Sequence, residues 1–310
     1  MEIFSINKSL ENRLKLIAGD SNVRCDEPMS SHCTFRAGGT AKYYVIPDEY
    51  KKVRDVLRLC VEENIPYYVI GNGSNLLVQD DGFDGVIIEI DSALAKIEIN
   101  GNEIVAKAGA KLSKIAVKAL NESLTGFEFA HGIPGNLGGA VTMNAGAYGG
   151  EMKDVLKWVK VLDNNGEMKT LKAEELELGY RTSIIVKEKM IVLEACIELH
   201  EGNRDEIEMH MKELMAKRKE KQPLEYPSAG STFKRPEGYF AGKLIQDAGL
   251  KGYRVGGAMV SEKHSGFVIN YDNATATDII NLMKDVRKKV YEEFQVTLEP
   301  EVKILPAVKW

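Results

Sequence analysis

The sequence predicts an α+β fold with more than one domain. Short strand-like segments dominate from about residue 70 to residue 200, amphipathic helices follow Asn203, and a glycine-rich stretch spans Ala130–Gly150. Short strands bounded by turn residues, with helices grouped elsewhere in the chain, are typical of α+β proteins. The chain has 310 residues, which is longer than one ordinary domain, so two or three domains are expected.

Composition excludes several classes of function. Hydrophobic residues make up 44% of the chain, and the net charge of −5 argues against a nucleic-acid-binding surface, although local basic pockets for a phosphorylated ligand are compatible with it. No stretch approaches the roughly 20 apolar residues that span a bilayer. The N-terminus alternates charged and apolar residues and lacks a signal-peptide core. We therefore expect a cytoplasmic protein without membrane or nucleic-acid partners.

Cysteine and histidine are scattered singly. Cys25, Cys33, Cys60 and Cys196 form no CxxC pair, so free thiols are expected rather than a zinc site or a disulfide framework. The histidines stand alone, without an i,i+4 pair on a helix, so no metal site is predicted. They occupy positions 32, 131, 200, 210 and 264.

The first 70 residues predict a helix followed by a strand–helix–strand unit. Apolar residues at helical spacing indicate a helix over 2–17, and a polar loop over 30–41 follows. The next elements indicate a βαβ unit, with a strand over 41–46, a helix over 49–63 and a strand over 67–70. Such a unit predicts a small parallel pair of strands.

A glycine-containing loop, GNGSNLLVQD, runs from Gly71 to Asp80. It is not a Rossmann loop, because a third glycine and a following helix are missing, and Leu76–Val78 indicates a strand instead. It is not a Walker loop either, because Gly-Lys-Ser/Thr is absent. Backbone N–H groups with Ser74 and Asn75 could hold a diphosphate, but a plain β-turn explains the pattern equally well.

The middle of the chain predicts mostly strands. Turn signals at Asn100-Gly101 and at Asn164-Asn165-Gly166 predict two hairpins. A short helix is expected over 111–121. The expected strands cover 86–90, 97–99, 103–108, 155–162, 167–171, 184–186 and 190–199.

The stretch Ala130–Gly150 holds seven glycines around a small apolar segment, Ala140–Met143. Glycine costs backbone entropy, so it gathers where a side chain would obstruct something. Two interpretations remain open from the residues alone. The backbone approaches a ligand closely, or the glycines form tight turns between short strands.

The last third of the chain predicts helices and further strands. Helices are expected over 203–221, 239–248 and 275–294, and strands over 253–260, 267–270 and 296–304. The loop PSAGSTFKRP covers 227–236. Within the last strand, LEPEV places Glu299 and Glu301 two residues apart, which alternation would put on one face. No nucleophile elbow is present, which gives a hydrolase little support.

Six motifs in order resemble one known family. TFRAGG, GNGSNLLV, HGIPGNLGGAVTMNAGAYG, GYRTSI, PSAGSTFKRP and LEPEVKI occur from about residue 30 to residue 305. Together they resemble the UDP-N-acetylenolpyruvoylglucosamine reductase (UDP-N-acetylmuramate dehydrogenase) family of peptidoglycan precursor synthesis. The resemblance implies an FAD-binding part of the vanillyl-alcohol-oxidase type and an α+β substrate-binding domain. The domains expected are 1–70, 71–202, 203–295 and a returning C-terminal segment, 296–310.

The resemblance also implies the cofactors. NADPH would reduce FAD and leave, and the enolpyruvyl ether of UDP-N-acetylglucosamine-enolpyruvate would then take the hydride at its methylene carbon. The residues that match the family's flavin-binding segments are Gly71, Asn72, Gly73, Ser74, Asn75, Leu76, Gly132, Ile133, Pro134, Gly135, Gly138, Gly139, Ala140, Asn144, Ala145, Gly146 and Tyr148.

Three residues match the family's catalytic positions: Ser231 as proton donor, Arg181 and Glu301. Arg181 could pair with the substrate carboxylate, and Glu301 could hold a hydrogen-bonding chain to the developing enol. The alternative interpretations are a turn-capping serine, with Ser228 as the turn serine by default, and a buried Arg–Glu structural pair.

The resemblance further implies substrate-binding residues. Lys221 matches the family's phosphate contact, with Tyr253 and Lys263 as weaker candidates. Arg235 stands where many relatives have Asn. The span from Arg181 to Ser231 is too short for the insertion with a lid tyrosine seen in one class of the family, so the chain resembles the shorter class.

Two rival functions remain. One is an FAD-dependent sugar or alcohol oxidase of the same superfamily, whose members often tether flavin through His or Cys. His32, Cys33 or His131 would then be the tether. The other is a non-catalytic nucleotide-sugar-binding module, in which Ser231 and Arg181 would be dispensable. No protein partner is implied.

Overall fold

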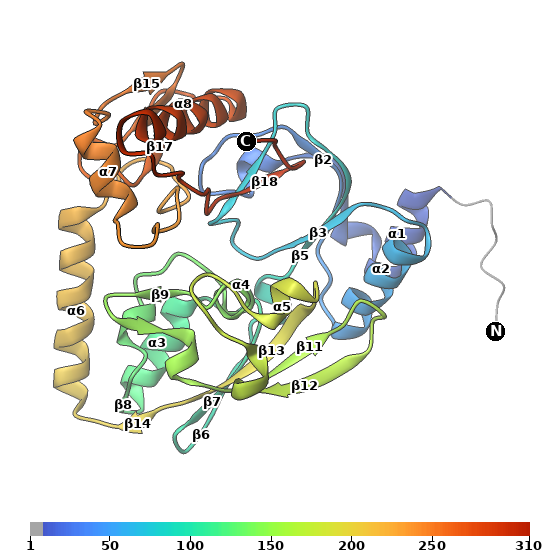
Figure 1. Ribbon diagram of the computed structural model, residues 1–310. Helices are drawn as coiled ribbons and strands as arrows, with labels where there is room; N and C mark the ends of the chain where they lie inside the picture. The colour runs from blue at the N-terminus through green and yellow to red at the C-terminus, as the bar shows by residue number, and fades with distance from the viewer. Residues whose placement is uncertain (1–8) are drawn as a thin grey trace. The chain divides into compact units, whose positions relative to one another are not determined.

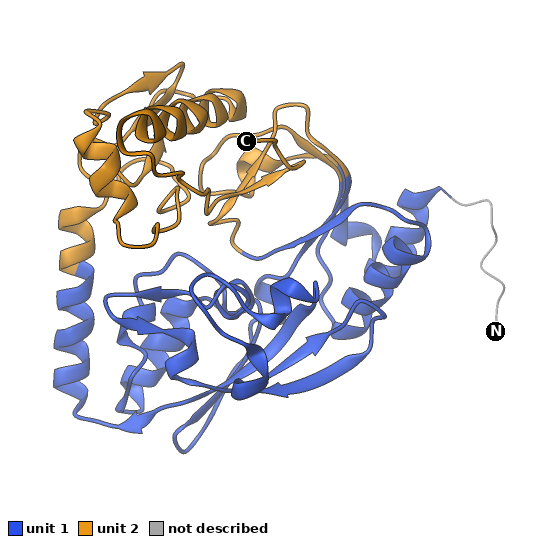
Figure 2. Ribbon diagram, in the orientation of Figure 1, with its two compact units in different colours: residues 1–25, 43–71, 85–215 blue, residues 26–42, 72–84, 216–310 orange. Residues whose placement is uncertain are grey.

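The computed structural model describes residues 9–310, which fold into helices and short strands (Figure 1). Two compact units divide them (Figure 2). Unit 1 contains residues 9–25, 43–71 and 85–215, and unit 2 contains residues 26–42, 72–84 and 216–310. Neither unit is one continuous stretch of chain. The four-part domain division predicted above stays a prediction.

The helices described in unit 1 include four that were predicted, one that was not, and one that replaces a predicted strand. They are α1 Leu10–Ala18, α2 Tyr50–Glu62, α3 Leu112–Asn121, α4 Leu137–Thr142, α5 Ile184–Lys187 and α6 Arg204–Lys221, whose last turns belong to unit 2. The Ser9 side chain caps α1 by accepting a hydrogen bond from the Asn12 N–H. Residues 2–8 of the predicted first helix lie outside the described residues.

The predicted strand over 184–186 is wrong. Residues Ile184–Lys187 form one helical turn, in which the Glu188 N–H donates to the Ile184 carbonyl at 2.8 Å. A short apolar run does not distinguish strand from helix by its period. Here the helical turn buries Ile185 completely, and this packing overrides the β propensity of its branched residues.

A five-stranded antiparallel sheet forms the main layer of unit 1 (Figure 1). Its strands, in spatial order, are β12 Met168–Lys172, β11 Leu156–Leu162, β13 Ile191–Glu198, β7 Glu103–Lys107 and β6 Ile97–Asn100. Both predicted hairpins are confirmed. Helix α3 contacts β7 and α4 contacts β13, so the two helices and the sheet enclose the largest apolar core.

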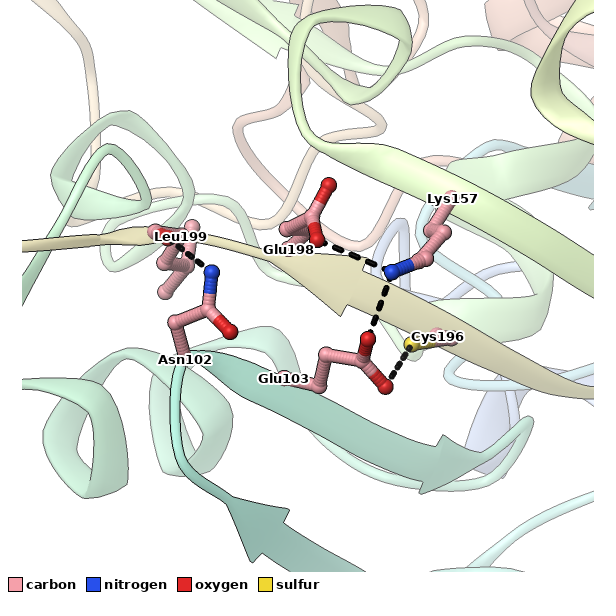
Figure 3. Close-up of polar contacts among 6 residues, drawn as sticks. All are labelled: Asn102, Glu103, Lys157, Cys196, Glu198 and Leu199. Carbon is pink, nitrogen blue, oxygen red and sulfur yellow. Dashed lines mark hydrogen bonds and ion pairs between the residues drawn. The ribbon is translucent and has the colours of Figure 1, made fainter.

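Polar side chains link three neighbouring strands of this sheet (Figure 3). The Lys157 ammonium on β11 lies 2.5 Å from Glu103 on β7 and 2.9 Å from Glu198 on β13. The Cys196 thiol points to the same Glu103 at 3.8 Å. Burial, together with this carboxylate, raises the pKa of the Cys196 thiol to about 11. All four cysteines are free thiols, as expected.

The predicted parallel pair of strands 41–46 and 67–70 is wrong, because the two strands are not adjacent in the second sheet. Its order is β1 Val23–Pro28, β2 Thr40–Val45, β5 Phe83–Glu89 and β3 Tyr67–Ile70. The two strands of the βαβ unit are not neighbours, because β5 lies between them and pairs in parallel with β3. Residues 86–88 of β5 are fully buried, as expected of a central strand with both faces covered. Strand β1 was not predicted. Four two-residue strands complete unit 1: β8 Leu124–Thr125, β9 Gly146–Ala147, β10 Gly150–Glu151 and β14 His200–Glu201.

Unit 2 packs around a long helix, α8 Ala276–Phe294. Thr275 and Asp278 form a capping box at its start, and Asp80 accepts hydrogen bonds from the Ala276 and Thr277 amides at 2.9 and 2.8 Å. The buried face of α8 lies in the core of the unit. The other elements are β4 Leu76–Val78, α7 Ala241–Asp247, β15 Arg254–Val255, β16 Ala258–Val260, β17 Val268–Asn270 and β18 Lys303–Leu305.

Two predicted strands of unit 2 are shorter than expected. The strand over 253–260 is a hairpin, β15–β16, because Gly256 adopts a φ of +53° and reverses the chain. The strand over 296–304 is confined to Lys303–Leu305, which pairs in parallel with β4. Pro300 lacks the N–H that a continuous ladder needs. Among residues 9–310, no helix is long and apolar enough to cross a membrane.

Candidate active site

The glycine-rich stretch lies in unit 1 and contains a helix. Residues Leu137–Thr142 form α4, where the sequence indicated only a small apolar segment. Leu137 and Val141 are fully buried, and the N–H groups of Leu137 and Gly138 donate to the carbonyls of Ala110 and Ala108 at 2.8 Å. This short helix is therefore anchored to the end of β7 and the start of α3 on one side.

The positions of this stretch require glycine for different reasons. A Cβ on Gly138 would lie 2.9 Å from the Ala108 Cβ, and one on Gly150 would lie 2.6 Å from the Phe129 ring. These two positions are required by packing within the protein. A Cβ on Gly139 would meet no atom within 4 Å. Gly139 therefore borders open space, which is where a ligand could approach the backbone.

Two buried polar atoms of the same stretch of chain have no hydrogen-bond partner among the described residues. They are Nδ1 of His131 and Oδ1 of Asn136. Asn136 is only 2% exposed, and its Nδ2 donates to the Ile90 carbonyl at 3.3 Å. Buried polar atoms are normally hydrogen-bonded, so an unpaired donor or acceptor here fits a site that holds a polar ligand. The residues thus suit the flavin that the sequence motifs imply.

The Gly71–Leu76 loop is divided between the two units. A Cβ on Gly71 would approach the Asn136 side chain in unit 1 at 3.2 Å. In unit 2, Gly73 has a φ of +59°, and a Cβ there would collide with the His32 carbonyl at 1.9 Å. The glycine at position 73 is therefore needed by the fold itself, whatever the loop binds.

Arg181 occupies the tip of a tight turn in unit 1. The Gly179 and Thr182 residues exchange main-chain hydrogen bonds of 3.1 and 3.3 Å, and Arg181 adopts a left-handed φ of +55° between them. Its guanidinium lies 5.6 Å from the centre of the Tyr180 ring. Left-handed backbone is unfavourable for a residue with a Cβ, so neighbouring contacts must hold this turn.

Asn144 supplies one of those contacts. Its Nδ2 donates to the Gly179 carbonyl at 3.1 Å and to Glu151 at 2.7 Å, while its Oδ1 accepts from the Lys153 N–H at 2.9 Å. Asn144 was predicted to line the flavin. That contact stays a prediction, and the Asn144 side chain is engaged by protein groups on both the amide nitrogen and the oxygen.

The segments that carry Ser231 and Glu301 pair with each other within unit 2. The Glu301 N–H donates to the Thr232 carbonyl at 2.9 Å, and Phe233 forms a β-bridge with Pro300. Ser231 is exposed, whereas Glu301 is 8% exposed. Thr232, which the sequence reasoning missed, ties this pairing to the rest of the unit, because its hydroxyl accepts from the Val268 N–H at 2.8 Å.

The predicted alternation of Glu299 and Glu301 on one face is wrong. The Glu299 side chain is 70% exposed and forms an ion pair with Lys234 at 3.0 Å, while Glu301 is buried. The segment is not a strand at these positions, so the period of two does not apply.

The predicted substrate-binding residues all lie in unit 2. The Lys263 ammonium donates to the Lys219 carbonyl at 2.8 Å, which places it at the end of α6 near the exposed Lys221. The Tyr253 hydroxyl instead donates to Asp285 on α8 at 2.9 Å. The Arg235 guanidinium stacks on the Phe240 ring at 4.0 Å.

Asn136 is a further candidate for the site; it lies within the predicted flavin-binding stretch Gly132–Gly139 but was not singled out from the sequence. It immediately precedes α4, and it lies inside the motif PGNLGG between two groups of predicted flavin-binding residues. An asparagine before a helix is usually a cap. Its side chain makes no cap hydrogen bond here, and only the structure reveals its buried oxygen. Among residues 9–310, no cluster of His, Cys, Asp or Glu could hold a metal ion.

Comparison with known proteins gives consistent matches. Residues 41–172 match the FAD binding domain, and residues 222–305 match the UDP-N-acetylenolpyruvoylglucosamine reductase C-terminal domain. The curated protein of that name from Lachnoclostridium phytofermentans is 53% identical over 97% of this chain and 98% of its own length. The one from Clostridium perfringens strain SM101 is 54% identical over 92% of this chain and 94% of its own length.

A solved structure agrees with these matches. The crystal structure of UDP-N-acetylenolpyruvylglucosamine reductase from Thermus caldophilus is 36% identical in sequence. It superposes with a TM-score of 0.78, covering 90% of this chain and 97% of that one.

Proposed function

The chain belongs to the UDP-N-acetylenolpyruvoylglucosamine reductase family, and we propose that it uses NADPH as electron donor and Ser231, Arg181 and Glu301 as catalytic residues. Membership confirms the resemblance drawn from the six motifs, together with the α+β fold class and the FAD cofactor. The chain is therefore an FAD-dependent oxidoreductase that acts in peptidoglycan precursor synthesis. The electron donor and the roles of individual residues are the proposal.

The residues of unit 1 offer a binding site for the cofactor. FAD supplies the hydride chemistry when bound, because no side chain can perform that step. The open space at Gly139, with the buried Nδ1 of His131 and Oδ1 of Asn136, supports the predicted contacts along 132–140. The remaining predicted flavin contacts belong to the same proposal: the Gly71–Leu76 loop, Ala145, Gly146 and Tyr148. At Asn144 the proposed contact is through the main chain only, because protein groups engage its side chain.

Reduction of the enolpyruvyl ether makes two demands on the protein. When a hydride equivalent adds to the methylene carbon, negative charge develops on the adjacent carbon and its carboxylate. A fixed cation must stabilise that charge, and a proton must reach the carbon. Arg181 suits the first task because its tight turn fixes the main chain, and a guanidinium matches a carboxylate in a bidentate manner.

Ser231 suits the second task, with Glu301 on the segment that pairs with its own. The observation that carries this proposal is the main-chain pairing of Thr232 and Phe233 with Glu301 and Pro300, because it brings the segment of the exposed Ser231 beside the segment of the buried Glu301 in unit 2. A serine is a weak acid at neutral pH, so it donates its proton only to a site with substantial developing charge. The buried carboxylate would orient that hydrogen-bonding chain.

The UDP diphosphate requires cations. Lys221 and Lys263 lie at the same end of α6, and their joint positive charge supports a phosphate-binding role. Tyr253 and Arg235 are held by Asp285 and Phe240, so each would contact substrate from an already ordered position.

The test separates the two halves of the reaction. NADPH-driven flavin reduction and subsequent turnover of UDP-N-acetylglucosamine-enolpyruvate are followed by stopped-flow absorbance in wild type, Ser231→Ala and Ser228→Ala. We expect Ser231→Ala to reduce flavin at the wild-type rate but to slow substrate reduction by about 10²–10⁴-fold, the usual contribution of a general acid. Ser228→Ala is the control from the same loop and should retain turnover.

Other results would redirect the proposal. Equal turnover by wild type and Ser231→Ala would remove the serine from the mechanism. Flavin reduction only by a sugar or alcohol, followed by oxidation with oxygen, would favour the oxidase alternative. A protein that binds the UDP-sugar without reducing it would favour the binding module.

A further inference from the structure

The turn that carries Arg181 is fastened to α4 at both of its ends. At the first end, the Asn144 Nδ2 donates to the Gly179 carbonyl at 3.1 Å. At the second end, the Ser183 hydroxyl donates to the Thr142 carbonyl at 2.6 Å. Thr142 and Asn144 stand at the C-terminal end of α4, inside the glycine-rich stretch. Two residues of one segment thus hold two residues that flank the arginine.

The two side chains that form these hydrogen bonds, Asn144 and Ser183, are buried. Asn144 is 1% exposed and Ser183 is fully buried, so their hydrogen bonds form where water cannot replace either partner. Asn144 also adopts a left-handed φ of +45°, a conformation that asparagine tolerates better than most residues. The side chain therefore reaches three partners, Gly179, Glu151 and Lys153, from one fixed backbone position.

We propose that Asn144 is a positioning residue for Arg181. It ties the arginine turn to the segment that begins at Gly132, so that the guanidinium and the flavin-binding backbone keep a fixed relationship. Ser183 holds the other end of the same turn. This inference rests on the proposed function, since it takes Arg181 as the residue that binds the substrate carboxylate.

The physical reason is the conformation of the turn. Arg181 has a φ of +55°, a left-handed backbone conformation that is unfavourable for a residue with a Cβ. Without the hydrogen bonds from Asn144 and Ser183, the turn would relax and move the guanidinium. A misplacement of about 1 Å in a group that orients substrate can lower a rate by about 10²-fold.

Asn144→Asp tests the inference with little change in shape. An aspartate keeps an oxygen to accept from the Lys153 N–H, but it replaces the amide donor by an oxygen that faces the Gly179 carbonyl and the Glu151 carboxylate. Asn164→Asp is the matched control, because Asn164 likewise donates to a loop carbonyl, that of Glu188, at 2.8 Å.

Three measurements are made on the FAD-loaded protein. Calorimetry gives the affinity of the oxidised enzyme for UDP-N-acetylglucosamine-enolpyruvate, stopped-flow gives both half-reactions, and hydrogen exchange gives the protection of the Thr182 amide. We expect Asn144→Asp to retain FAD and NADPH-driven flavin reduction. Substrate affinity and the rate of substrate reduction should each fall by about 10–100-fold. Protection of the Thr182 amide should fall as well, and Asn164→Asp should resemble wild type.

A double-mutant cycle separates positioning from a general structural effect. If Asn144 acts through Arg181, then Asn144→Asp should produce no further loss in an Arg181→Ala background. The same fold loss in both backgrounds, or wild-type behaviour of Asn144→Asp, would overturn the inference and leave the proposed function intact. Wild-type activity of Arg181→Ala would overturn the role of the arginine and this inference with it.

Discussion

The side-chain amide of Asn75 donates a hydrogen bond to the main-chain carbonyl of Glu301 at 3.2 Å. The Lys303 N–H returns a bond to the Asn75 carbonyl at 3.0 Å, just before β18 pairs with β4. One residue of the GNGSNLLV motif therefore orders the segment that carries the proposed catalytic carboxylate. The motif has a structural task in unit 2 in addition to the flavin contact proposed for it.

Glu301 and Glu299 can be tested against each other, because the first is buried and the second is exposed. Glu301→Gln keeps the size of a buried side chain and removes its charge, so we expect substrate reduction to slow by about 10²–10⁴-fold. Flavin reduction by NADPH and the melting temperature should stay near wild type. Glu299→Gln changes an exposed side chain and should affect neither half-reaction. A comparable loss in both variants would argue against a specific role for Glu301.

Variants at Gly139 and Gly150 distinguish a glycine that leaves room for a ligand from a glycine that packing within the protein requires. Gly139→Ala adds a Cβ into open space on a helix, so the apo-protein should be unchanged or about 0.5–1 kcal/mol more stable to urea. Its affinity for FAD should fall. Gly150→Ala must displace the buried Phe129 ring, which costs about 1–3 kcal/mol of unfolding free energy. Unchanged FAD affinity in Gly139→Ala would exclude this surface as a flavin contact.

Sequence reasoning located most helices because their apolar periodicity is long and their ends carry stop signals. Helix α8, with Thr275 at its cap, is the clearest case. The failures share a cause, which is that burial in three dimensions decides between local alternatives. Ile184–Lys187 became a helical turn to bury Ile185, and β5 separated β2 from β3 because its apolar residues needed the centre of the sheet.

The candidate site likewise has features that the sequence predicts and features that it does not. The motifs predict Arg181, Ser231 and Glu301 as catalytic residues, and these roles stay predictions. Strand alternation was wrong for Glu299, which lies outside any strand. Side-chain partners across long separations leave no local pattern. The bonds from Asn144 to Gly179 and from Asn75 to Glu301 span 35 and 226 residues, so no spacing rule could predict them.

The flavin should be held without a covalent bond. Cys33, one of the tethers considered for an oxidase, is 6% exposed, and its thiol donates to the Ala37 carbonyl at 3.1 Å. Burial raises the pKa of the Cys33 thiol, so the nucleophilic thiolate is disfavoured at neutral pH. We expect all the flavin to pass an ultrafiltration membrane after the protein is unfolded in urea. Flavin absorbance retained with the unfolded chain would revive the oxidase interpretation.

His264 should make stability depend on pH in a defined window. Its Nδ1 accepts a hydrogen bond from the Gly266 N–H at 3.1 Å, and its ring packs edge-on against Phe267 at 4.9 Å. Burial lowers the pKa of His264 below its ordinary value of 6.5, with a smaller contribution in the same direction from Lys251. The folded protein thus prefers the neutral imidazole, which keeps Nδ1 as an acceptor.

The sign of the effect follows from linkage. Below about pH 6.5 the unfolded chain binds a proton that the folded chain resists, so the stabilisation by this histidine is complete above that pH and is lost as pH falls toward the lowered folded-state pKa. Unfolding free energies from urea titrations should therefore decline less between pH 7.5 and pH 5 for His264→Asn than for wild type. Asparagine can replace the Nδ1 acceptor without titrating. The exposed His210→Asn on α6 serves as control and should follow wild type. An equal decline in wild type and His264→Asn would show that His264 is not the group responsible.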